Sequence, residues 1–376
     1  MTDSRIRGAV SLAVSLRAPS RIPCRVRLGQ VASVLVAFVL PVRLPAVAGL
    51  FGLFALVALA AMVAFAAPVA AQPPAVDHDK DYVLTPVSTA RGEGVPAGTT
   101  RMVVHNSSGG GVFPGTIRRV WVHLPAESIL KTVGAEGLAV IVFQDGHAYV
   151  DEQGQFRAPV VIDNLVHAGT IPPVAAIFVD PGHSGRTLPG EKPGWQPAPN
   201  NRSVEYDTLS PTYAEFLEEV ILSIAASDER LKAAGVRLTA DPTRRAICGI
   251  SSGGICAFTV AFERPDLFAN VISHVGSFTD IRGGDHYPAL VRKTKGAAKP
   301  IRVALQAGEN DLDNQHGNWW LGNLQMQKAL AFAGYDHLFI GGVGAHNGKH
   351  GGMVLPEMLA WIWRDWRGAA RPEPAR

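Results

Sequence analysis

Cysteine is scarce in this sequence, with only three residues in a chain of 376. Cys24 lies in a basic N-terminal stretch, which leaves Cys248 and Cys256 for the rest of the chain. One of these closes a predicted strand and the other lies inside a predicted helix, and both have apolar neighbours. Cysteines in such settings behave as small buried hydrophobic residues. We therefore predict two buried free thiols and no disulfide.

Complete metal-binding and phosphate-binding motifs are also missing. His346 and His350 have the spacing of a zinc-protease helix, but no Glu follows His346 and Gly348 disfavours a helix. The acids at 309, 311 and 313 alternate like calcium-loop ligands, but the asparagine at 314 stands where that loop needs glycine. The Gly-Lys pair at 348–349 lacks the other residues of a phosphate loop. We predict no metal and no cofactor.

Positive charge is not a property of the main part of the chain. The whole sequence has 35 Lys/Arg and 32 Asp/Glu, but seven of the basic residues and one acid fall within residues 1–71. Residues 72–376 therefore carry a net charge near −3 and contain no Lys/Arg-rich stripe. Nucleic-acid binding needs such a stripe, so the sequence excludes nucleic acid as a partner.

The N-terminal 71 residues have the pattern of a secretory signal peptide. Arginines precede an apolar segment at 46–67, and small residues at 69–71 fit a cleavage site after Ala71. We expect an exported protein, periplasmic or secreted, that meets a membrane only through this segment. An uncleaved anchor is the alternative, because the 22 residues at 46–67 are long enough to cross a bilayer as a helix.

Residues 72–100 form a predicted linker or extended arm, and 101–370 a predicted single α/β domain. An antiparallel strand pair is expected at 101–105 and 116–124. Short apolar runs, typical of parallel strands that are covered on both faces, follow at 138–143, 175–179, 246–250, 271–275 and 301–305. Helical segments are expected at 159–167, 211–231, 255–263, 319–333 and 356–366. This alternation predicts a doubly wound, mostly parallel sheet.

A G-x-S-x-G pattern at 249–253 joins one of these strands to the following helix. Such a strand–turn–helix is the nucleophile elbow of α/β-hydrolases, and it leaves little room two residues before and after the serine. Gly249 and Gly253 satisfy that requirement around Ser251. Centring the turn on Ser252 would place Ile250 in the crowded position. Ser251 is the predicted nucleophile.

A serine nucleophile needs a base and an acid, and in α/β-hydrolases both follow the serine in the chain, the acid first. The loop after the strand at 301–305 offers three carboxylates. Asp311 is the preferred acid, while Asp313 and Glu309 remain open as second and third choices.

The base is sought among the four histidines that follow, His316, His337, His346 and His350. His316 is close to the acid in sequence, and His337 opens a predicted strand at 338–340. His346 comes just after that strand, in a glycine-rich loop that can turn an imidazole back towards the elbow. His346 is therefore preferred over His350.

An ester hydrolase also needs donors for the negative oxygen of its intermediate. The backbone N–H of Ser252 is one expected donor, and the N–H of His147 or Gly146, after the strand at 138–143, is the other. Asp145 and Trp319 are candidate substrate contacts. For Asp145 a simple turn, and for Trp319 a place in the core, are the alternatives.

These motifs together resemble a known family. The segments 142–147 (VFQDGH), 202–207 (RSVEYD), 249–253 (GISSG), 274–278 (HVGSF), 308–311 (GEND) and 344–351 (GAHNGKHG) occur in order along 116–366. They are similar to the esterase family of α/β-hydrolases that groups enterochelin esterases, feruloyl esterases, S-formylglutathione hydrolases and mycolyltransferases. The resemblance implies an α/β-hydrolase fold, a Ser251, Asp311, His346 triad, and oxyanion donors at Ser252 and His147.

The sequence thus favours an exported serine hydrolase of carboxylic esters that needs no cofactor. Its expected substrate is a small-molecule or carbohydrate ester of feruloyl, acetyl or siderophore type. Transfer of the acyl group to a carbohydrate and a non-catalytic binding role on the same fold remain the alternative hypotheses.

Overall fold

A computed structural model describes residues 76–107, 109–184 and 201–368. The predicted signal peptide, its cleavage site and the apolar segment at 46–67 lie outside these ranges. No helix in the described ranges is long and apolar enough to cross a membrane.

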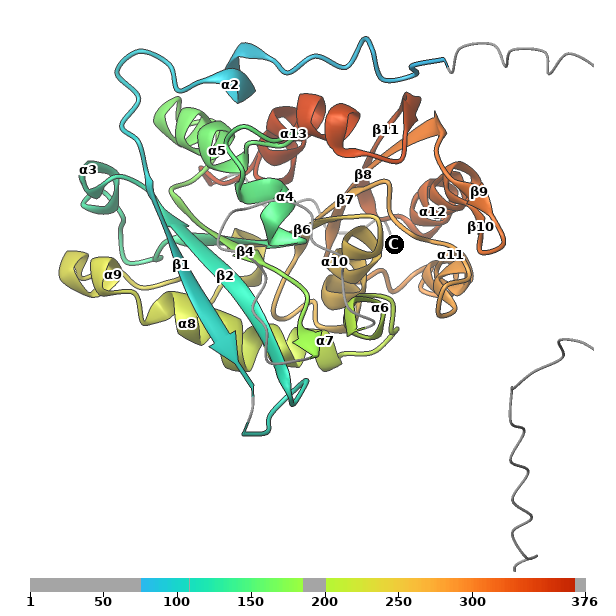
Figure 1. Ribbon diagram of the computed structural model, residues 1–376, viewed down its shortest axis with the longest axis horizontal. Coiled ribbons are helices and arrows are strands. Elements are labelled where there is room, and N and C mark those ends of the chain that lie inside the picture. Colours follow the sequence, from blue (N-terminus) through green and yellow to red (C-terminus); the bar gives the residue numbers. More distant parts are fainter. Residues whose placement is uncertain (1–75, 108, 185–200, 369–376) are drawn as a thin grey trace, which may run out of the picture. The chain divides into compact units, whose positions relative to one another are not determined.

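The described residues form a sheet with helices on both faces (Figure 1). Its main strands run in the order β1-β2-β4-β3-β6-β7-β8-β11, and β5 pairs with β2. The strands are β1 (Thr99–Asn106), β2 (Thr116–Leu124), β3 (Ala139–Gln144), β4 (Val174–Val179), β5 (His183–Ser184), β6 (Arg245–Ile250), β7 (Asn270–His274), β8 (Arg302–Asn310) and β11 (Asp336–Ala345), with a separate pair, β9 (Asp313–Asn314) and β10 (Gly317–Asn318). All neighbours from β4 to β11 are parallel, while β1, β2 and β4 pair antiparallel. The predicted fold class, including the antiparallel N-terminal pair, is confirmed.

Helices pack against each face, as a doubly wound sheet requires. They are α2 (Pro86–Thr89), α3 (Glu127–Leu130), α4 (Gly146–Val150), α5 (Ala158–His167), α6 (Asn201–Tyr206), α7 (Thr212–Phe216), α8 (Leu222–Ala226), α9 (Glu229–Ala234), α10 (Ser252–Glu263), α11 (Tyr287–Arg292), α12 (Trp319–Ala333) and α13 (Gly348–Ile362). One hydrophobic core lies between the sheet and α7, α8, α10, α11 and α12; the other lies between the sheet and α4, α5 and α13.

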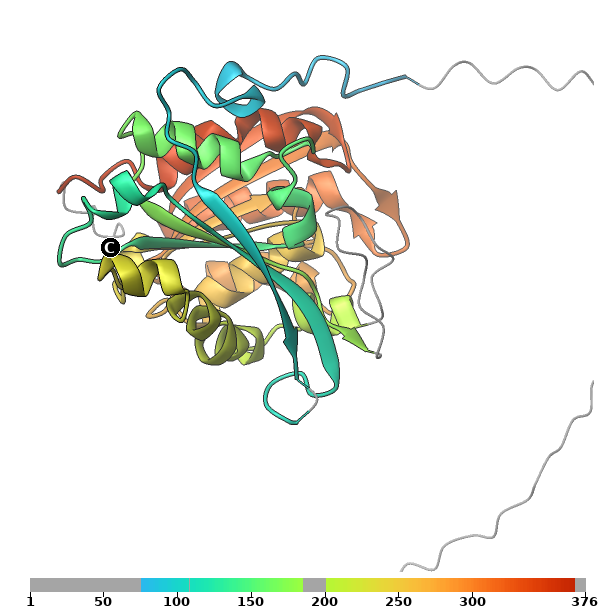
Figure 2. The same cartoon turned by 60° about the vertical axis from the view of Figure 1, so that its left-hand side comes forward.

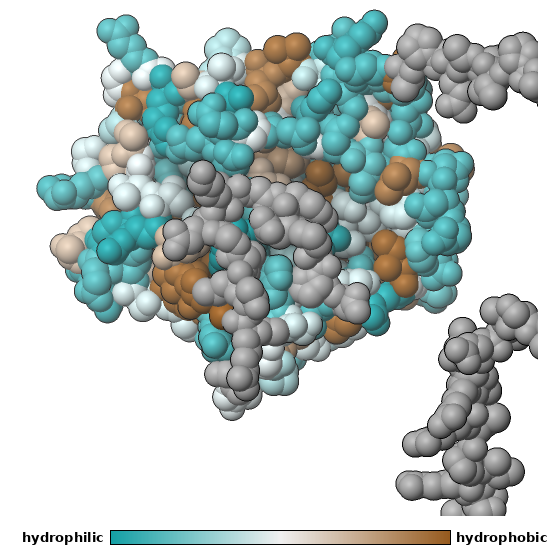
Figure 3. Space-filling view, in the orientation of Figure 1, coloured by the Kyte–Doolittle hydropathy of each residue, from teal (hydrophilic) through white to brown (hydrophobic). Residues whose placement is uncertain are grey.

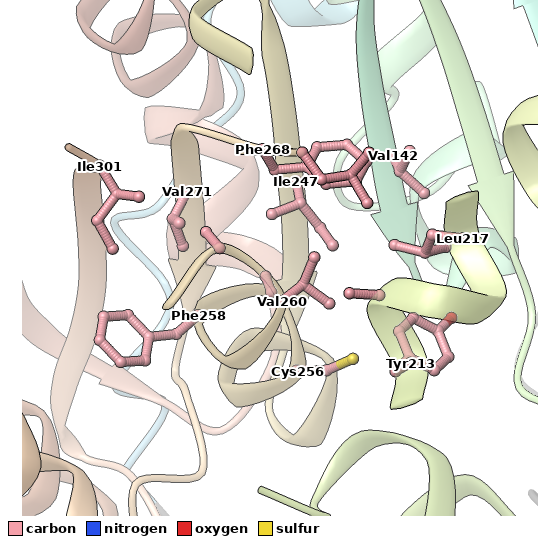
Figure 4. Close-up of a cluster of buried hydrophobic side chains, with 14 of the residues drawn as sticks. Val142, Tyr213, Leu217, Ile247, Cys256, Phe258, Val260, Phe268, Val271 and Ile301 are labelled. Carbon is pink, nitrogen blue, oxygen red and sulfur yellow. The ribbon is translucent and has the colours of Figure 1, made fainter. Parts of the chain in front are cut away.

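The parallel strands are apolar on both sides because each side faces one of these cores. In the first core, Val142, Ile247 and Val271 of three adjacent strands lie beside Val260 of α10 and Leu217 (Figure 4). The buried thiol of Cys256 belongs to the same core, and Cys248 belongs to the other. Both cysteines are free and buried, as the sequence predicts.

Two predicted helices differ from the structure. The segment at 211–231 is interrupted: a π-helical turn, Leu217–Ile221, separates α7 from α8, and α9 starts anew where the Asp228 side chain accepts the N–H of Arg230. The last helix, predicted to begin at Pro356, begins eight residues earlier at Gly348. The side chain of Asn347 caps it by accepting the N–H of Lys349.

Residues 76–98 pack along the domain as an arm rather than hanging free. Figures 1 and 2 show this stretch with α2 passing over α5 and α13, and contacts of α2 with both helices agree. Arg91 pairs with Glu152 and Asp163, at 2.7 Å in each case. Within the predicted linker or arm at 72–100, residues 76–98 thus lie against the domain.

On the face shown in Figure 3, hydrophobic side chains form several separate groups among hydrophilic ones. The exposed apolar residues of the described ranges include Met102, Val103 and Val104 of β1, the strand at one edge of the sheet.

Candidate active site

The elbow places Ser251 between β6 and α10 with an unusual backbone conformation. Ser251 has φ 59° and ψ −122°, a region that costs a non-glycine residue energy and is often found at functional sites. A Cβ on Gly249 would lie 2.1 Å from the carbonyl oxygen of Gly253, and one on Gly253 would lie 2.9 Å from Asp145 Oδ2. Both flanking glycines are therefore required by close contacts, as the pattern predicts.

Three residues from distant parts of the chain meet at this turn. Ser251 Oγ lies 2.8 Å from Nε2 of His346, and Nδ1 of the same imidazole lies 2.5 Å from Oδ1 of Asp311. The Asp311 side chain is fully buried beside the histidine. The loop after β8 supplies the acid, and the loop between β11 and α13 supplies the histidine. This arrangement can activate a serine hydroxyl, because the imidazole can accept its proton while the carboxylate orients the ring.

The alternative acids and bases lie elsewhere. Glu309 and Asp313 are exposed. His316 and His337 contact backbone carbonyl oxygens, those of Asp280 and Tyr335. His350 lies within α13 and contacts Gln306 at 3.0 Å. None of these five side chains is hydrogen-bonded to Ser251, whose hydroxyl contacts His346 and Ser277.

Helix α10 begins directly after the Ser251 position, so its N-terminus lies beside the serine. Ser252 is the first residue of this helix, so its N–H belongs to the positive end of the helix dipole. That geometry suits the role expected of Ser252. The carboxyl group of Asp207 lies near the Ser252 hydroxyl, and burial raises the pKa of this carboxyl group.

The prediction for His147 needs correction. Its backbone N–H donates to Oδ1 of Asp180 at 3.0 Å, and its Nδ1 lies 2.8 Å from the same oxygen. Asp180 in turn accepts from Nε of Arg119 at 2.6 Å. This N–H is therefore already engaged by a carboxylate, and it does not serve as an oxyanion donor in this arrangement.

The two candidate substrate contacts, Asp145 and Trp319, are both buried. Asp145 is 0% exposed, and both its oxygens accept from Arg202, at 2.8 and 2.7 Å. Trp319 is 3% exposed and lies edge-on to the His346 ring, with the centroids 5.8 Å apart. Trp319 belongs to the packing around the histidine, as the core alternative holds, and Asp145 to an ion pair.

Sequence reasoning did not single out Ser277. Its Oγ accepts the indole N–H of Trp319 at 3.0 Å and lies 3.3 Å from Ser251 Oγ. Ser277 also donates its backbone N–H to the carbonyl oxygen of Ser251. Ser277 follows β7, which pairs with β6, the strand that leads into Ser251. Its position after a strand adjacent to β6 was the signal that could have identified it.

A cavity of about 580 Å³ opens beside Ser251. Its lining includes His147, Ala148, Phe156, Arg202, Ile250 and His346. The cavity thus combines an apolar wall with cationic and imidazole groups, and its volume suits a small organic molecule. No cluster of three or more His, Cys, Asp or Glu side chains in the described ranges is arranged to hold a metal ion.

Comparisons with solved structures agree on the fold. The enterobactin esterase FES from Shigella flexneri, in the presence of 2,3-di-hydroxy-N-benzoyl-serine, has a TM-score of 0.55 and 18% identity over 76% of this chain and 64% of its own. The ferric enterobactin esterase of Salmonella typhimurium has a TM-score of 0.51 and 17% identity over 73% and 60%. The CE1 ferulic acid esterase AmCE1/Fae1A from Anaeromyces mucronatus, in complex with ferulic acid, has a TM-score of 0.50 and 14% identity over 74% and 96%.

At these identities the likeness extends to the fold alone. This chain spans less than two thirds of the length of the enterobactin esterases that it matches. No curated protein matches it by sequence. A family model described as "Putative esterase" matches residues 113–360, which is more than half of the chain and contains Ser251, Asp311 and His346. The chain belongs to this esterase family.

Proposed function

We propose that the protein is a serine hydrolase of carboxylic esters. The observation that carries the proposal is the continuous contact from Ser251 through His346 to the buried Asp311. Membership of the esterase family supports the same reaction.

In the proposed mechanism, the Ser251 hydroxyl donates to Nε2 of His346 and attacks the ester carbonyl as the imidazole takes its proton. Asp311 accepts the N–H at Nδ1 and stabilises the imidazolium. The negative oxygen of the tetrahedral intermediate is stabilised at the N-terminus of α10 by the Ser252 N–H. The alcohol leaves with the proton held by His346. Water then gives a proton to the same imidazole and attacks the acyl-enzyme; His346 returns that proton to Ser251 Oγ as the carboxylic acid is released.

For the substrate, we propose an ester whose acyl group is a small aromatic acid. Phe156, Ala148 and Ile250 give the cavity beside Ser251 an apolar wall of suitable size. Two structures of similar fold were solved with aromatic acids, a dihydroxybenzoyl-serine and ferulic acid. Comparing kcat/KM for feruloyl, catecholate-siderophore, acetylated-xylan and glucuronoyl esters tests this proposal. A preference for the acetyl or glucuronoyl ester would contradict it.

Replacing the nucleophile tests the central claim. Ser251→Ala should lower turnover of p-nitrophenyl acetate by about 10³-fold or more, because the remaining groups cannot form an acyl-enzyme. Ser252→Ala, which keeps its backbone N–H, is the matched control and should retain activity. Thermal unfolding of both variants should stay near that of the wild type.

The alternative functions give different results in related assays. A non-catalytic binding protein would leave Ser251 unlabelled by a fluorophosphonate probe, whereas the proposed hydrolase should be labelled at that residue. An acyltransferase would divert the acyl group from water when a sugar acceptor is added. Export to the periplasm or exterior stays part of the proposal, and detection of a mature N-terminus at Gln72 would support it.

A further inference from the structure

Residues 341–347, which are the end of β11 and the turn that carries His346, form what we call the histidine loop, and the arm at 76–98 holds it from outside the sheet. Its principal contact is Asp79, which is only 6% exposed. Asp79 Oδ1 accepts the backbone N–H of Ala345 at 3.0 Å, and Oδ2 accepts from the side-chain amide of Asn347 at 2.6 Å. One carboxylate thus binds the residues immediately before and after the histidine.

A second arm residue holds the same loop further upstream. The hydroxyl oxygen of Tyr82 accepts the backbone N–H of Val343 at 2.8 Å. The Tyr82 ring stacks on His350 of α13, with centroids 4.1 Å apart and planes inclined by 10°. Tyr82 therefore connects the start of the loop to the helix that follows it.

The glycines of this loop give the arm its space. A Cβ on Gly342 would lie 2.3 Å from the Tyr82 hydroxyl oxygen, and one on Gly344 would lie 3.0 Å from Asp79 Oδ1. Real Cβ atoms do not approach as closely as the first distance, so a side chain at 342 would displace the tyrosine. The glycines before His346 thus leave room for the Tyr82 and Asp79 side chains and also allow the loop to bend.

The contact with Asn347 requires a carboxylate at position 79. Asn347 Oδ1 already accepts the N–H of Lys349 as the cap of α13, so its amide nitrogen is what faces the arm. The partner at 79 must therefore accept two hydrogen bonds, one from this amide and one from the Ala345 N–H. An aspartate does so, while an asparagine would set its own NH₂ against one of the two donors.

The loop needs such support because its pairing with the sheet is irregular. β11 pairs in register with β8 up to Gly342, and the register shifts between Gly342 and Ala345. The N–H groups of Val343 and Ala345, in and next to this bulge, are the two that the arm accepts. His346 must nevertheless meet Ser251 and Asp311 at once, a geometry that a small displacement would spoil.

We infer that the arm at 76–98 is a working part of the active site, in which Asp79 and Tyr82 are positioning residues for His346. They hold the imidazole between Ser251 and Asp311 without touching the substrate. This inference rests on the proposed function, because it assigns the arm a role in the same reaction. The remainder of the arm is fastened to α5, where the Asn164 amide donates to the carbonyl oxygens of Val87 and Ala90, at 2.8 Å each.

The test uses substitutions in the full-length protein. Asp79→Asn should lower kcat for p-nitrophenyl acetate about tenfold and Asp79→Ala roughly a hundredfold, with KM nearly unchanged, because the imidazole loses its alignment. Each rate is divided by the amount of Ser251 that a fluorophosphonate probe labels. Unfolded protein, which the probe does not label, then does not affect the comparison. Asp79→Glu, which keeps two acceptor oxygens, should recover part of the loss. Asp81→Asn is the matched control, because Asp81 is exposed on the same arm, and it should match the wild type.

Hydrogen exchange gives a second measurement that does not depend on activity. Peptides that cover 341–347 should exchange faster in Asp79→Asn and Tyr82→Phe than in the wild type or Asp81→Asn. If Asp79→Ala keeps the wild-type kcat per labelled serine, or if exchange at 341–347 is unchanged, the inference is wrong. A wild-type protein without ester turnover or serine labelling would instead overturn the proposed function, and exchange would still decide whether the arm holds the loop.

Discussion

At the scale of single residues, burial separates the acid beside the histidine from its neighbours. Asp311 and Asp313 have the same side chain and lie two residues apart in one loop, yet the first is fully buried against His346 and the second is exposed. A buried carboxylate fixed at Nδ1 selects one tautomer of the imidazole and stabilises its protonated form. The two aspartates therefore form a matched pair for mutation.

Asp311→Asn should lower kcat by about 10³- to 10⁴-fold, because an amide at Nδ1 favours the wrong tautomer of the ring. Asp313→Asn should change kcat by less than about twofold. Steady-state kinetics with p-nitrophenyl acetate, together with thermal unfolding of both variants, checks this. A larger loss in Asp313→Asn than in Asp311→Asn would move the acid to position 313.

Chain order and local spacing pointed to the three residues that meet at the elbow, although they left Asp313 and Glu309 open as the acid. Ser251, Asp311 and His346 each follow a strand that is recognisable from its apolar run, so the ends of those strands predict a meeting point. The sequence could not predict that Asp180 engages the N–H of His147, or that Arg202 engages Asp145. Such pairs join residues 33 and 57 positions apart, and no periodic pattern marks them.

At the scale of secondary-structure elements, the tightness of the elbow gives a graded prediction. A Cβ on Gly249 would meet backbone atoms of Gly253, whereas one on Gly253 would meet mainly side-chain atoms of Asp145 and Gln144. Backbone atoms of a strand and helix cannot move aside as side chains can. The first substitution should therefore be the more damaging of the two.

Gly249→Ala should lower the free energy of unfolding by about 3 kcal/mol and abolish ester turnover, while Gly253→Ala should cost about 1 to 2 kcal/mol. Gly109→Ala is the control, since a Cβ there would meet no atom within 4 Å. Urea unfolding of the three variants measures the difference. Equal losses at 249 and 253 would contradict this account of the turn.

The helices show why local propensity was an incomplete guide. Glycines at 348, 351 and 352 argue against a helix, yet α13 includes all three. A Cβ on Gly352 would lie 1.9 Å from the carbonyl oxygen of Gln155, and one on Gly351 would lie 2.9 Å from the His274 ring. These glycines allow the helix to pack closely on its neighbours, so tertiary contact outweighs their low helix propensity. The strands, by contrast, are set by burial on both faces, and the apolar runs of the sequence predicted their positions well.

At the scale of the whole molecule, a buried histidine links folding to pH. His274, at the end of β7, is fully buried, with Tyr149 Oη 2.9 Å and Cys248 Sγ 3.9 Å from its Nδ1. Burial, aided by nearby His350, lowers its pKa from 6.5 to about 3. The unfolded chain therefore binds a proton below pH 6.5 that the folded chain does not, so this contribution to stability declines as the pH falls from about 6.5 towards 3.

The wild type should lose up to about 1.4 kcal/mol per pH unit through this group in that range. In His274→Gln the difference in unfolding free energy between pH 7 and pH 5 should be about 2 kcal/mol smaller than in the wild type. His167→Gln, at an exposed position of α5, should keep the wild-type dependence. Urea unfolding at a series of pH values measures the slopes, and equal slopes in all three proteins would refute the assignment.

The packing of the arm also bears on where the functional unit of this protein begins. The sheet starts at Thr99, and the family match starts at residue 113. A chain shortened to begin at either position would retain every residue from Ser251 to His346. It would nevertheless leave the N–H groups of Val343 and Ala345 to water and remove the stacking partner of His350. A boundary drawn from strands or from family likeness thus separates the histidine loop from Asp79, which contacts it from twenty residues before the first strand.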